Sequence, residues 1–513
     1  MPPEILSYNG GINPDTSLGT LPQNQLVSAK NVILTGASLI NRGGPFKLVV
    51  VNGTGGASKY VSSLFYWNDQ VNEKEWFIMG ARDTSNNPQI YQMVNDGTTT
   101  TATVITSGSA NEWAQYDVLN GILCIAASAL PLQWTGVGSV SALGASWTTL
   151  NVSMLAVKTV NNILFFAGNL SSYIYWSSVG DPTTYNSGNF IPFRLSDGDT
   201  IQALSYIGTD LIIFKRFSIG ALSTQTQILS GVVTLGPLTT LNVGIGCASP
   251  NAVDRLPDGR LVFLGGNGHL YLFDGNVPID VSQQAYPGSS VQSLITAAAQ
   301  FFVYGTGGAI VKVVPMRHEV WVILQDPGAN ANDYWIYDYL NNIWIEKPST
   351  TNTYQIISAC VGSSGKFTNP SGFKTVAGTL SGTYDQMNVL ITGDAGGTVW
   401  IEDCGINTDQ SGSDPITQIE FSIPVQSDQR SNVRNFFVLP LKTGSASQTI
   451  TYYVGQNGTY GSSQTFTTTG NWDRLQIQLI NADYMTSQQI KVTYPTASTV
   501  QFDPAYISQE ADQ

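Results

Sequence analysis

The stretch Arg260-Leu-Val-Phe-Leu-Gly-Gly-Asn-Gly-His-Leu-Tyr-Leu-Phe-Asp-Gly275 contains two short apolar strands joined by a glycine-rich turn, and the second strand closes on an acidic residue. The same arrangement returns more loosely in Asn388-Val-Leu-Ile-Thr-Gly-Asp-Ala-Gly-Gly-Thr-Val-Trp-Ile-Glu-Asp403. A unit of this size cannot bury its own apolar face, so a series of such units must stack or close radially. The repetition therefore predicts the fold, and the fold narrows the function.

The composition predicts an all-β protein. Only 11% of the 513 residues are charged and 51 are glycine, which is poor material for solvent-exposed helices. Val, Ile, Thr, Tyr, Phe and Trp recur in short runs instead, and these residues favour pleated sheets. The length exceeds what one core usually organises, so we expect one large repeated domain plus one or two smaller ones.

Seven apolar segments mark the repeated units, and we interpret each segment as the inner strand of one unit. Their spacing, roughly 40 to 70 residues, includes the period of roughly 40 to 50 that propeller blades show. Several segments are followed by a partner strand, and a weaker strand such as Thr200–Leu204 lies upstream. Three or four short antiparallel strands are the content of a propeller blade. The segments are Trp76–Met79, Ile122–Ile125, Ile163–Phe166, Leu211–Phe214, Leu261–Leu264, Val320–Ile323 and Val389–Ile391.

We therefore predict a β-propeller of seven blades over residues 47–405. A propeller of six blades is the alternative if one unit is an insertion. Tandem β-sandwiches would also satisfy the strand content, but sandwich strands do not repeat one internal phrase, so the propeller is favoured.

The two ends of the chain differ from the repeated region. Residues 1–46 alternate turn-forming residues with single apolar residues, which describes an extended arm with brief strands that docks either on its own domain or on another subunit. A polar linker at 405–414 is followed by five alternating strands, which predict a C-terminal β-sandwich domain over 406–513 that ends in a polar tail at 509–513. The five strands are Gln418–Ile423, Asn435–Leu439, Thr449–Val454, Arg474–Leu479 and Gln489–Tyr494.

The charge and the cysteines exclude several classes of function. A formal net charge of −13 argues against a grip on nucleic acid through clustered Lys and Arg, but it is compatible with nucleic acid passing by. The four cysteines are far apart and form no C-x-x-C pair, so neither a zinc site nor a disulfide framework is predicted. The start, Met1-Pro-Pro-Glu-Ile-Leu6, does not resemble a secretory peptide, and no apolar run approaches the roughly 18 to 20 residues of a membrane helix.

The sequence offers no set of residues for catalysis, cofactor binding or metal binding. His269 and His318 lie in different units, and we expect each to be a surface or hydrogen-bonded histidine. No Ser-His-Asp set can be proposed. The segment Gly362-Ser-Ser-Gly-Lys366 lacks the spacer and the final Ser or Thr of a phosphate loop and is interpreted as a turn.

Acidic residues recur near turns, and each group has a structural interpretation. The segment Thr392-Gly-Asp-Ala-Gly-Gly-Thr-Val-Trp400 resembles the Asp-box of sialidase-type propellers with one extra residue before Trp400, and in that family the box is a hairpin turn. Asp197 and Asp199 are expected to cap or brace a loop rather than to form the paired carboxylates of a glycosidase. The acids between Asp403 and Asp414 do not have EF-hand spacing.

Two regions resemble tail proteins of short-tailed bacteriophages. One is Tyr175-Trp-Ser-Ser-Val-Gly-Asp-Pro182 followed by Phe193-Arg-Leu-Ser-Asp-Gly-Asp-Thr-Ile-Gln-Ala-Leu204 and Leu211-Ile-Ile-Phe-Lys-Arg-Phe-Ser-Ile219. The similarity covers the first 220 residues and, more loosely, the C-terminal domain, and it consists of turn and apolar patterns. The N-terminal positions that resemble the opening of those proteins are Gly10-Gly-Ile12, Leu21-Pro22, Gln25, Ala29, Asn31, Gly36, Leu39 and Arg42-Gly-Gly44.

This resemblance implies a tail nozzle, also called a tail tubular or packaged-DNA stabilisation protein. In that family six copies form a ring below the portal and its adaptor, and the ring surrounds the DNA channel. The resemblance thus implies a virion protein, assembled in the host cytoplasm, that retains packaged DNA and serves as its ejection channel, with no cofactor and no enzymatic activity. A tail needle or tail fibres are further candidate partners. No individual channel-lining or interface residue follows from it.

Two other functions remain open. The first is a glycan-binding or glycan-hydrolysing β-propeller, because 11 Trp and 23 Tyr could stack on sugars, although most of them lie in apolar strands where core packing accounts for them. The second is a scaffold or receptor-binding tail protein, which differs from a nozzle only in its location within the particle.

Overall fold

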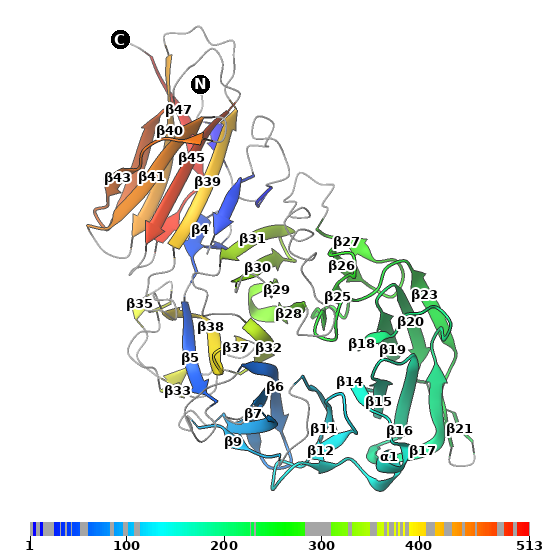
Figure 1. Cartoon of the computed structure of the whole chain (residues 1–513). Coiled ribbons are helices and arrows are strands. Elements are labelled where there is room, and N and C mark those ends of the chain that lie inside the picture. Colours follow the sequence, from blue (N-terminus) through cyan, green and yellow to red (C-terminus); the bar gives the residue numbers. More distant parts are fainter. Residues whose placement is uncertain are drawn as a thin grey trace.

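The computed structural model shows a β-propeller with a β-sandwich domain attached to one side of the ring (Figure 1). This confirms the predicted fold class. The residues that the structure describes are 4–6, 11–13, 25–30, 32–35, 38–42, 44–51, 60–82, 87–95, 101–106, 113–225, 227–229, 232–282, 309–326, 331–348, 356–363, 367–368, 374–375, 378–379, 383–384, 389–406, 416–424, 433–443, 447–456, 459–479, 487–495 and 500–511.

Seven antiparallel four-stranded blades form the ring within these residues. Blades 1 to 3 consist of β6 (Val61–Asp69), β7 (Lys74–Arg82), β8 (Pro88–Val94) and β9 (Thr103–Val104); β10 (Gln115–Leu119), β11 (Ile122–Ala126), β12 (Leu132–Trp134) and β13 (Ser141–Ala142); and β14 (Met154–Val160), β15 (Ile163–Gly168), β16 (Tyr173–Ser178) and β17 (Asp181–Pro192). Blades 4 and 5 consist of β18 (Ile201–Ile207), β19 (Asp210–Lys215), β20 (Ser218–Ser223) and β23 (Leu238–Val243); and β24 (Val253–Arg255), β25 (Leu261–Leu264), β26 (Leu270–Phe273) and β27 (Ile279–Asp280). Blades 6 and 7 consist of β28 (Ile310–Val314), β29 (Glu319–Asp326), β30 (Ala331–Asp338) and β31 (Ile343–Pro348); and β32 (Ile356–Gly362), β37 (Val389–Asp394), β38 (Thr398–Ile406) and β5 (Gly44–Val50).

Each of the seven predicted apolar segments falls in a different blade, but it forms the second strand rather than the innermost one. The innermost strands are the weaker strands upstream, which contact one another around the centre of the ring (Figure 1). Second strands are the most apolar because both of their faces are covered by neighbouring blades. In β15, for example, all six residues are buried.

Apolar clusters fill the interfaces between neighbouring blades. Phe77 and Met79 of blade 1 pack with Ile391 and Val399 of blade 7, which closes the ring between the last and the first blade. Separate clusters join blades 1 and 2, blades 2 and 3, and blades 3 and 4, and one large cluster extends from blade 4 through blade 6 into the sandwich domain. The core is therefore distributed around the ring, as expected when each unit must bury its faces against its neighbours.

The N-terminal segment supplies the outermost strand of the last blade. β5 pairs antiparallel with β38, with Val49 opposite Val399 and Val50 opposite Thr398. Because β5 begins at Gly44, the propeller takes in residues ahead of position 47. The ring is thus closed by a strand from the opposite end of the sequence.

Two packed sheets form the sandwich domain, and all five predicted C-terminal strands are present. Phe421 and Phe437 meet between the sheets with ring centroids 4.9 Å apart. The prediction of a polar tail is wrong for residues 509–511, because they belong to the last strand and pair with β40. One sheet contains β2 (Ser28–Lys30), β39 (Ile416–Pro424), β45 (Ser487–Pro495), β41 (Thr449–Gln456), β42 (Thr459–Tyr460) and β43 (Gln464–Thr467). The other contains β1 (Glu4–Leu6), β47 (Ala505–Ala511), β40 (Val433–Thr443), β46 (Val500–Phe502), β4 (Ser38–Asn41), β3 (Val32–Thr35) and β44 (Trp472–Gln478).

One sheet runs continuously from the propeller into the sandwich. β2 lies between β31 of blade 6 and β39 of the sandwich, which produces a ten-stranded sheet. Lys30 in β2 forms an ion pair of 3.0 Å with Glu346 in β31. The N-terminal segment therefore pairs with strands of its own chain in both domains.

A buried ion pair lies at the same junction. Arg42, fully buried, donates from Nη1 and Nη2 to the two carboxylate oxygens of Glu319 at 3.1 and 2.6 Å. Its Nε also donates to the Val32 carbonyl, and its guanidinium carbon lies 5.5 Å from the ring centroid of Trp321. The indole of Trp321 donates to the same carboxylate. The pair thus connects the N-terminal segment to blade 6.

Asparagine side chains connect successive blades on one face of the ring. In each case the asparagine lies in the turn between the first two strands of a blade and donates to a carbonyl beside the third strand of the next blade. The three bonds run from Asn72 to the Thr135 carbonyl, from Asn120 to the Gly180 carbonyl and from Asn161 to the Thr224 carbonyl.

Substitution of Asn161 separates two contributions of this turn. Asn161 has a left-handed backbone with φ of 47° and donates to Thr224 at 3.0 Å. Asn161→Gly removes only the side-chain bond and is expected to lower the free energy of unfolding by about 0.5–1.5 kcal/mol. Asn161→Ala is expected to lose about 1 kcal/mol more, because a left-handed backbone is unfavourable for alanine. Urea unfolding of both variants measures this, and equal losses would contradict the backbone contribution.

The remaining elements lie in connections between strands. They are the helix α1 (Ala145–Leu150), the 3₁₀ turn η1 (Pro315–Arg317), and the short strands β21 (Gln227–Leu229), β22 (Val232–Thr234), β33 (Phe367–Thr368), β34 (Lys374–Thr375), β35 (Gly378–Thr379) and β36 (Thr383–Tyr384). Within the described ranges, no helix has the length and apolar character needed to cross a membrane.

Candidate functional site

The centre of the propeller carries a group of polar side chains, which we call the axial cluster: Asp117, Lys158, Tyr206, Asp254 and Arg255. They lie on the innermost strands of blades 2 to 5. An innermost strand has a free backbone edge, and two of these edges are capped by carboxylates. Asp117 Oδ2 accepts from the Thr159 amide at 2.8 Å, and Asp254 Oδ2 accepts from the Val313 amide at 2.9 Å. In both cases an acid of one blade binds the edge of the next blade.

The cations of the axial cluster gather around Asp117 and Tyr206. Lys158 Nζ lies 3.0 Å from Asp117 Oδ2 and 5.8 Å from the ring centroid of Tyr206. Arg255 donates to the Tyr206 hydroxyl at 2.8 Å, with its guanidinium carbon 4.4 Å from the same centroid. Burial would lower the pKa of Lys158, but Asp117, Tyr206 and Asp254 raise it above its usual value. Lys158 is therefore a fixed positive charge.

The opposite sides of the ring also meet near its centre. Gln115 of blade 2 donates to the side chain of Asn251 at 2.8 Å, and Asn251 lies two residues before the first strand of blade 5. The Asn251 carbonyl accepts from the Val311 amide of blade 6. A direct hydrogen bond therefore spans the middle of the propeller.

The axial carboxylates are held as acceptors. Besides the neighbouring strand edges, Asp117 accepts from the Val118 amide and Asp254 from the Arg255 amide. A hydrolytic pair in a glycosidase needs one carboxylic acid that can donate a proton and a second carboxylate facing it across the bond to be cleaved. The bonds of Asp117 and Asp254 suit the joining of blades better than proton transfer.

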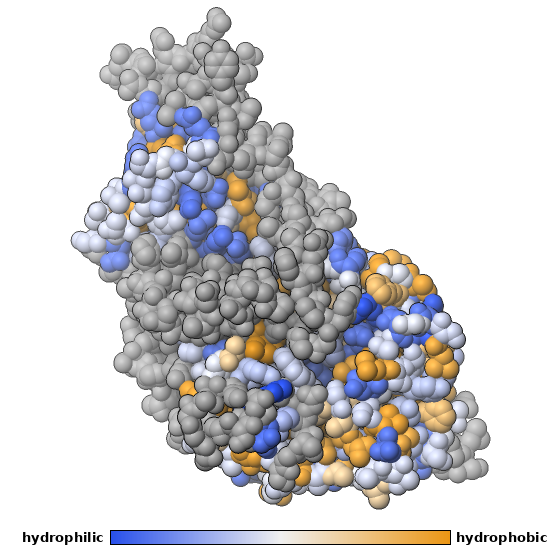
Figure 2. All heavy atoms as spheres, viewed as in Figure 1, coloured by the Kyte–Doolittle hydropathy of each residue, from blue (hydrophilic) through white to orange (hydrophobic). Residues whose placement is uncertain are grey.

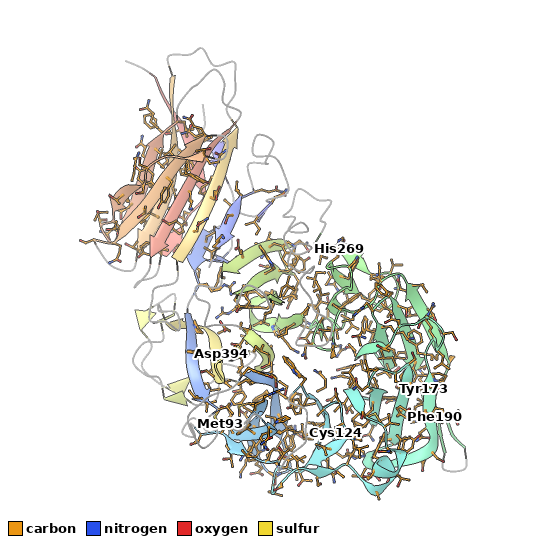
Figure 3. All side chains as sticks on the ribbon, in the orientation of Figure 1. Met93, Cys124, Tyr173, Phe190, His269 and Asp394 are labelled. Atoms are coloured by element: carbon orange, nitrogen blue, oxygen red, sulfur yellow. The ribbon has the colours of Figure 1, made fainter. Side chains whose placement is uncertain are left out.

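Each histidine has a local structural partner, in agreement with the sequence-based expectation. His269 Nδ1 lies 2.6 Å from Asp280 Oδ2 within blade 5, and Asp280 Oδ1 accepts from the Ser282 amide and hydroxyl. His318 is exposed, has a φ of 56°, and packs edge-to-face on Tyr339. Figure 3 shows His269 and Asp394 on different blades. The structure does not bring the two histidines together.

Asp197 and Asp199 brace a loop around a buried lysine, as predicted. Lys215 Nζ, fully buried, donates to Asp197 Oδ1 at 2.7 Å and to the carbonyls of Arg194 and Asp199 at 2.8 and 3.0 Å. Arg194 Nε contacts the second oxygen of Asp197, and Asp199 accepts from the Phe217 amide. Burial would raise the pKa of Asp197, but hydrogen bonds from Lys215, the Asp199 amide and Arg194 lower it below its usual value.

The lowered pKa of Asp197 predicts a loss of stability in acid. Because its pKa is lower in the folded chain, its contribution is present above the unfolded value, about 4, and is lost as the pH falls through the folded value. Asp197→Asn is expected to lower the melting temperature at pH 7 and to differ less from the parent at pH 3. Thermal unfolding at both pH values tests this, and a difference that does not shrink in acid would contradict it.

The Asp-box-like segment is a hairpin turn between β37 and β38 of blade 7. Asp394 accepts from the amides of Gly396 and Thr398 at 2.8 Å, and its other oxygen accepts from the Trp400 indole at 2.8 Å. Asp69 in blade 1 binds its own turn in the same way and also accepts from the indole of Trp76. Only the Asp394 turn could be recognised from the sequence, because the Asp69 turn lacks the glycines of the Asp394 turn.

The other sequence candidates lie in turns or are buried where the structure describes them. Gly362 ends β32 and lies against the Tyr66 ring of blade 1, while residues 364–366 lie outside the described residues. So do residues 407–414 of the rejected calcium loop. Cys124, Cys247 and Cys360 are buried free thiols, and burial raises the pKa of Cys247 to about 12. Across the described part of the chain, no group of three or more His, Cys, Asp or Glu residues could hold a metal ion.

An aromatic surface on blade 3 was not anticipated from the sequence. It consists of Tyr173, Tyr175, Tyr185 and Phe190, which we call the blade 3 aromatic surface, and the buried Trp147 of α1 lies beneath Tyr185. Phe190 is 45% exposed. Figure 3 shows Tyr173 and Phe190 beside each other on β16 and β17. Figure 2 shows apolar residues interspersed with hydrophilic ones over this half of the ring.

Comparison with known proteins leaves the family of this chain open. No protein-family model and no curated protein matches the sequence. Among solved structures, the exo-β-1,3-galactanase of Phanerochaete chrysosporium with galactose is 10% identical, with a TM-score of 0.26, and the match covers 90% of this chain and 99% of that one. The structure of TmCBM61 in complex with β-1,4-galactotriose is 16% identical, with a TM-score of 0.15, over 18% of this chain and 63% of that one. TM-scores this low carry no functional argument.

Proposed function

We propose that this chain is a non-enzymatic structural protein of a short-tailed bacteriophage: the tail nozzle that retains packaged DNA and serves as its ejection channel. The observation that carries the proposal is the joining of the propeller to the sandwich by one ten-stranded sheet and by the buried Arg42–Glu319 pair. A subunit in the wall of a DNA channel must resist deformation, and a shared sheet keeps two domains from moving independently.

The residues that carry the bacteriophage resemblance have defined roles in this fold. Arg42, in the N-terminal run, forms the buried ion pair at the junction of the two domains. Asp197 and Lys215, in the second run, form the bonded loop between blades 3 and 4. The resemblance thus rests on residues that hold the architecture together, which supports its extension to the shape of the subunit.

The acidic charge supports passage of DNA rather than its capture. With a formal net charge of −13, the chain would repel a phosphate backbone at short range. Contacts between lysines and phosphates slow the transit of DNA, and this chain would make few of them. We expect only weak binding of duplex DNA at physiological salt, measured by fluorescence anisotropy with a labelled duplex. A submicromolar complex with duplex DNA under these conditions would contradict the proposed role as a DNA channel.

Electron microscopy tests the assembly directly. The full-length chain is mixed with the portal–adaptor complex of the same particle and imaged in negative stain, with the complex alone as the control. The proposal expects a ring of additional density, six-fold symmetric and coaxial with the portal, below the adaptor. Labelling of whole particles with an antibody against the chain distinguishes a nozzle from a scaffold or a peripheral receptor-binding protein. Label at the tail tip or on fibres, or no ring, would contradict the nozzle.

Glycan binding is a second candidate function, and one specific observation favours it: the blade 3 aromatic surface. Glycan hydrolysis is not favoured, because the axial carboxylates are held by strand edges and cations.

A further inference from the structure

A bulge in the outermost strand of blade 3 creates the aromatic surface. On β16, Tyr175 and Ser177 are two residues apart, whereas their partners on β17, Phe190 and Tyr185, are five residues apart. Four residues of β17, 186–189, therefore lie opposite the single residue Trp176 of β16, and the register shifts between these pairs. A bulge of this kind re-aims side chains and is common beside binding sites. Here it brings Tyr185 and Phe190 to 6.3 and 6.2 Å from the Tyr175 ring centroid.

The four rings form a contiguous cluster whose members are inclined to one another, by 54° between Tyr173 and Phe190. The centroids of Tyr173 and Phe190 are 5.9 Å apart, and Tyr173 lies 6.4 Å from Tyr175. Tyr175 and Tyr185 are largely buried, whereas Tyr173 is half-buried and Phe190 exposed. The outer two rings therefore offer their surfaces to solvent while the inner two support them.

The tyrosine hydroxyls of this cluster are available to a ligand. Within the described residues, the hydroxyls of Tyr173, Tyr175 and Tyr185 make no hydrogen bond to another protein group. Burial and the neighbouring Tyr173 raise the pKa of Tyr175, and burial and Tyr175 raise that of Tyr185, so both hydroxyls remain donors at neutral pH. Neither hydroxyl oxygen is among the buried polar atoms that lack a partner in the described residues, so both can also be reached from solvent.

We propose that the blade 3 aromatic surface binds a neutral saccharide, with a pyranose ring stacked on the exposed Phe190, the inclined ring of Tyr173 at its side, and its hydroxyls bonded to the tyrosine hydroxyls. A pyranose combines an apolar C–H face with a rim of hydroxyl groups, and this surface combines aromatic faces with unpartnered phenol groups. None of its four residues is charged, and the nearby Asp181 is occupied by the hydroxyls of Thr183 and Thr184. The proposal does not depend on the assembly role proposed above.

Titration with defined sugars tests this site. The full chain is first applied to an array of bacterial surface glycans. It is then titrated with cellotriose, laminaritriose and the anionic 3′-sialyllactose, with binding followed by saturation-transfer NMR. We expect binding of a neutral saccharide, and a loss of roughly two- to tenfold in affinity for each of Phe190→Ala and Tyr173→Ala. Phe217→Ala, which removes a 50% exposed ring on blade 4, is the matched control and should leave affinity unchanged.

Two further measurements make the outcome decisive. Tyr173→Phe keeps the ring and removes the hydroxyl, so it should retain stacking and lose only the hydrogen-bonding part of the affinity. Thermal unfolding of each variant shows whether a loss of binding reflects loss of the fold. Absence of binding to every neutral saccharide, or equal binding by the parent and Phe190→Ala, would overturn the proposal. If Phe190→Ala bound sugar as the parent does but no longer assembled into a ring, the surface would be a contact between subunits instead.

Discussion

Arg42→Met is expected to lower the free energy of unfolding by roughly 3–5 kcal/mol, the cost of leaving one partner of a buried ion pair uncompensated. Glu319 is 3% exposed and would lose both guanidinium hydrogen bonds. The Trp321 indole, which also donates to this carboxylate, is a neutral donor and cannot replace the positive charge. Urea unfolding followed by circular dichroism measures the loss.

Two comparisons isolate the charge effect. Lys30→Ala breaks an ion pair in the same region, but that pair is partly exposed, so we expect a loss of about 0–1 kcal/mol. Replacing both partners, as Arg42→Met with Glu319→Met, should destabilise less than Arg42→Met alone, because no uncompensated charge remains buried. If Arg42→Met were no worse than Lys30→Ala, the buried pair would not stabilise the domain junction.

Deletion of residues 1–51 is expected to abolish the cooperative unfolding of the chain. The deletion removes β5, which leaves the edge of β38 unpaired, and it removes β2, which leaves β31 and β39 without the strand between them. Exposed edges of this kind pair with other chains. Size-exclusion chromatography with light scattering should show aggregates in place of the parent species.

A peptide and a shorter deletion act as controls. A synthetic peptide of residues 25–51 contains β2 to β5 and should restore part of the parent behaviour when it is added during refolding. Deletion of residues 1–10 removes only the three-residue edge strand β1 and should leave the propeller intact. A chain that stays monomeric with an unchanged melting temperature after loss of residues 1–51 would show that β5 does not close the ring.

The blades could be predicted because their second strands are nearly uninterrupted apolar runs. Strand β5 could not be assigned, because its partner lies about 350 positions further along the sequence and no local pattern specifies the pairing. The prediction of a polar tail at 509–511 was wrong for a related reason. These residues form a strand that is held by backbone pairing with β40, and their sequence has no apolar pattern that would indicate a strand. Sequence patterns report burial, so they miss strands that are held mainly by hydrogen bonds.

The candidate sites were harder to predict than the fold. Asp117 and Asp254 lie on short, weakly apolar strands, and their role depends on which strand edge lies beside them. The blade 3 aromatic surface depends on a register shift within β17, which no periodicity shows. By contrast, Asp197 and His269 were assigned correctly, because residues within or beside a turn usually bond to their near neighbours.

The hydrogen bond between Gln115 and Asn251 restricts where a polymer could travel. Because this bond joins blades on opposite sides of the ring, it crosses the central channel, and a double helix cannot pass through an individual propeller. If six copies form the proposed nozzle, the outer surfaces of neighbouring copies must therefore enclose the route for DNA. The residues that meet DNA would then come from blade exteriors or from the sandwich, and mutagenesis aimed at the axial cluster would leave conduction unaltered.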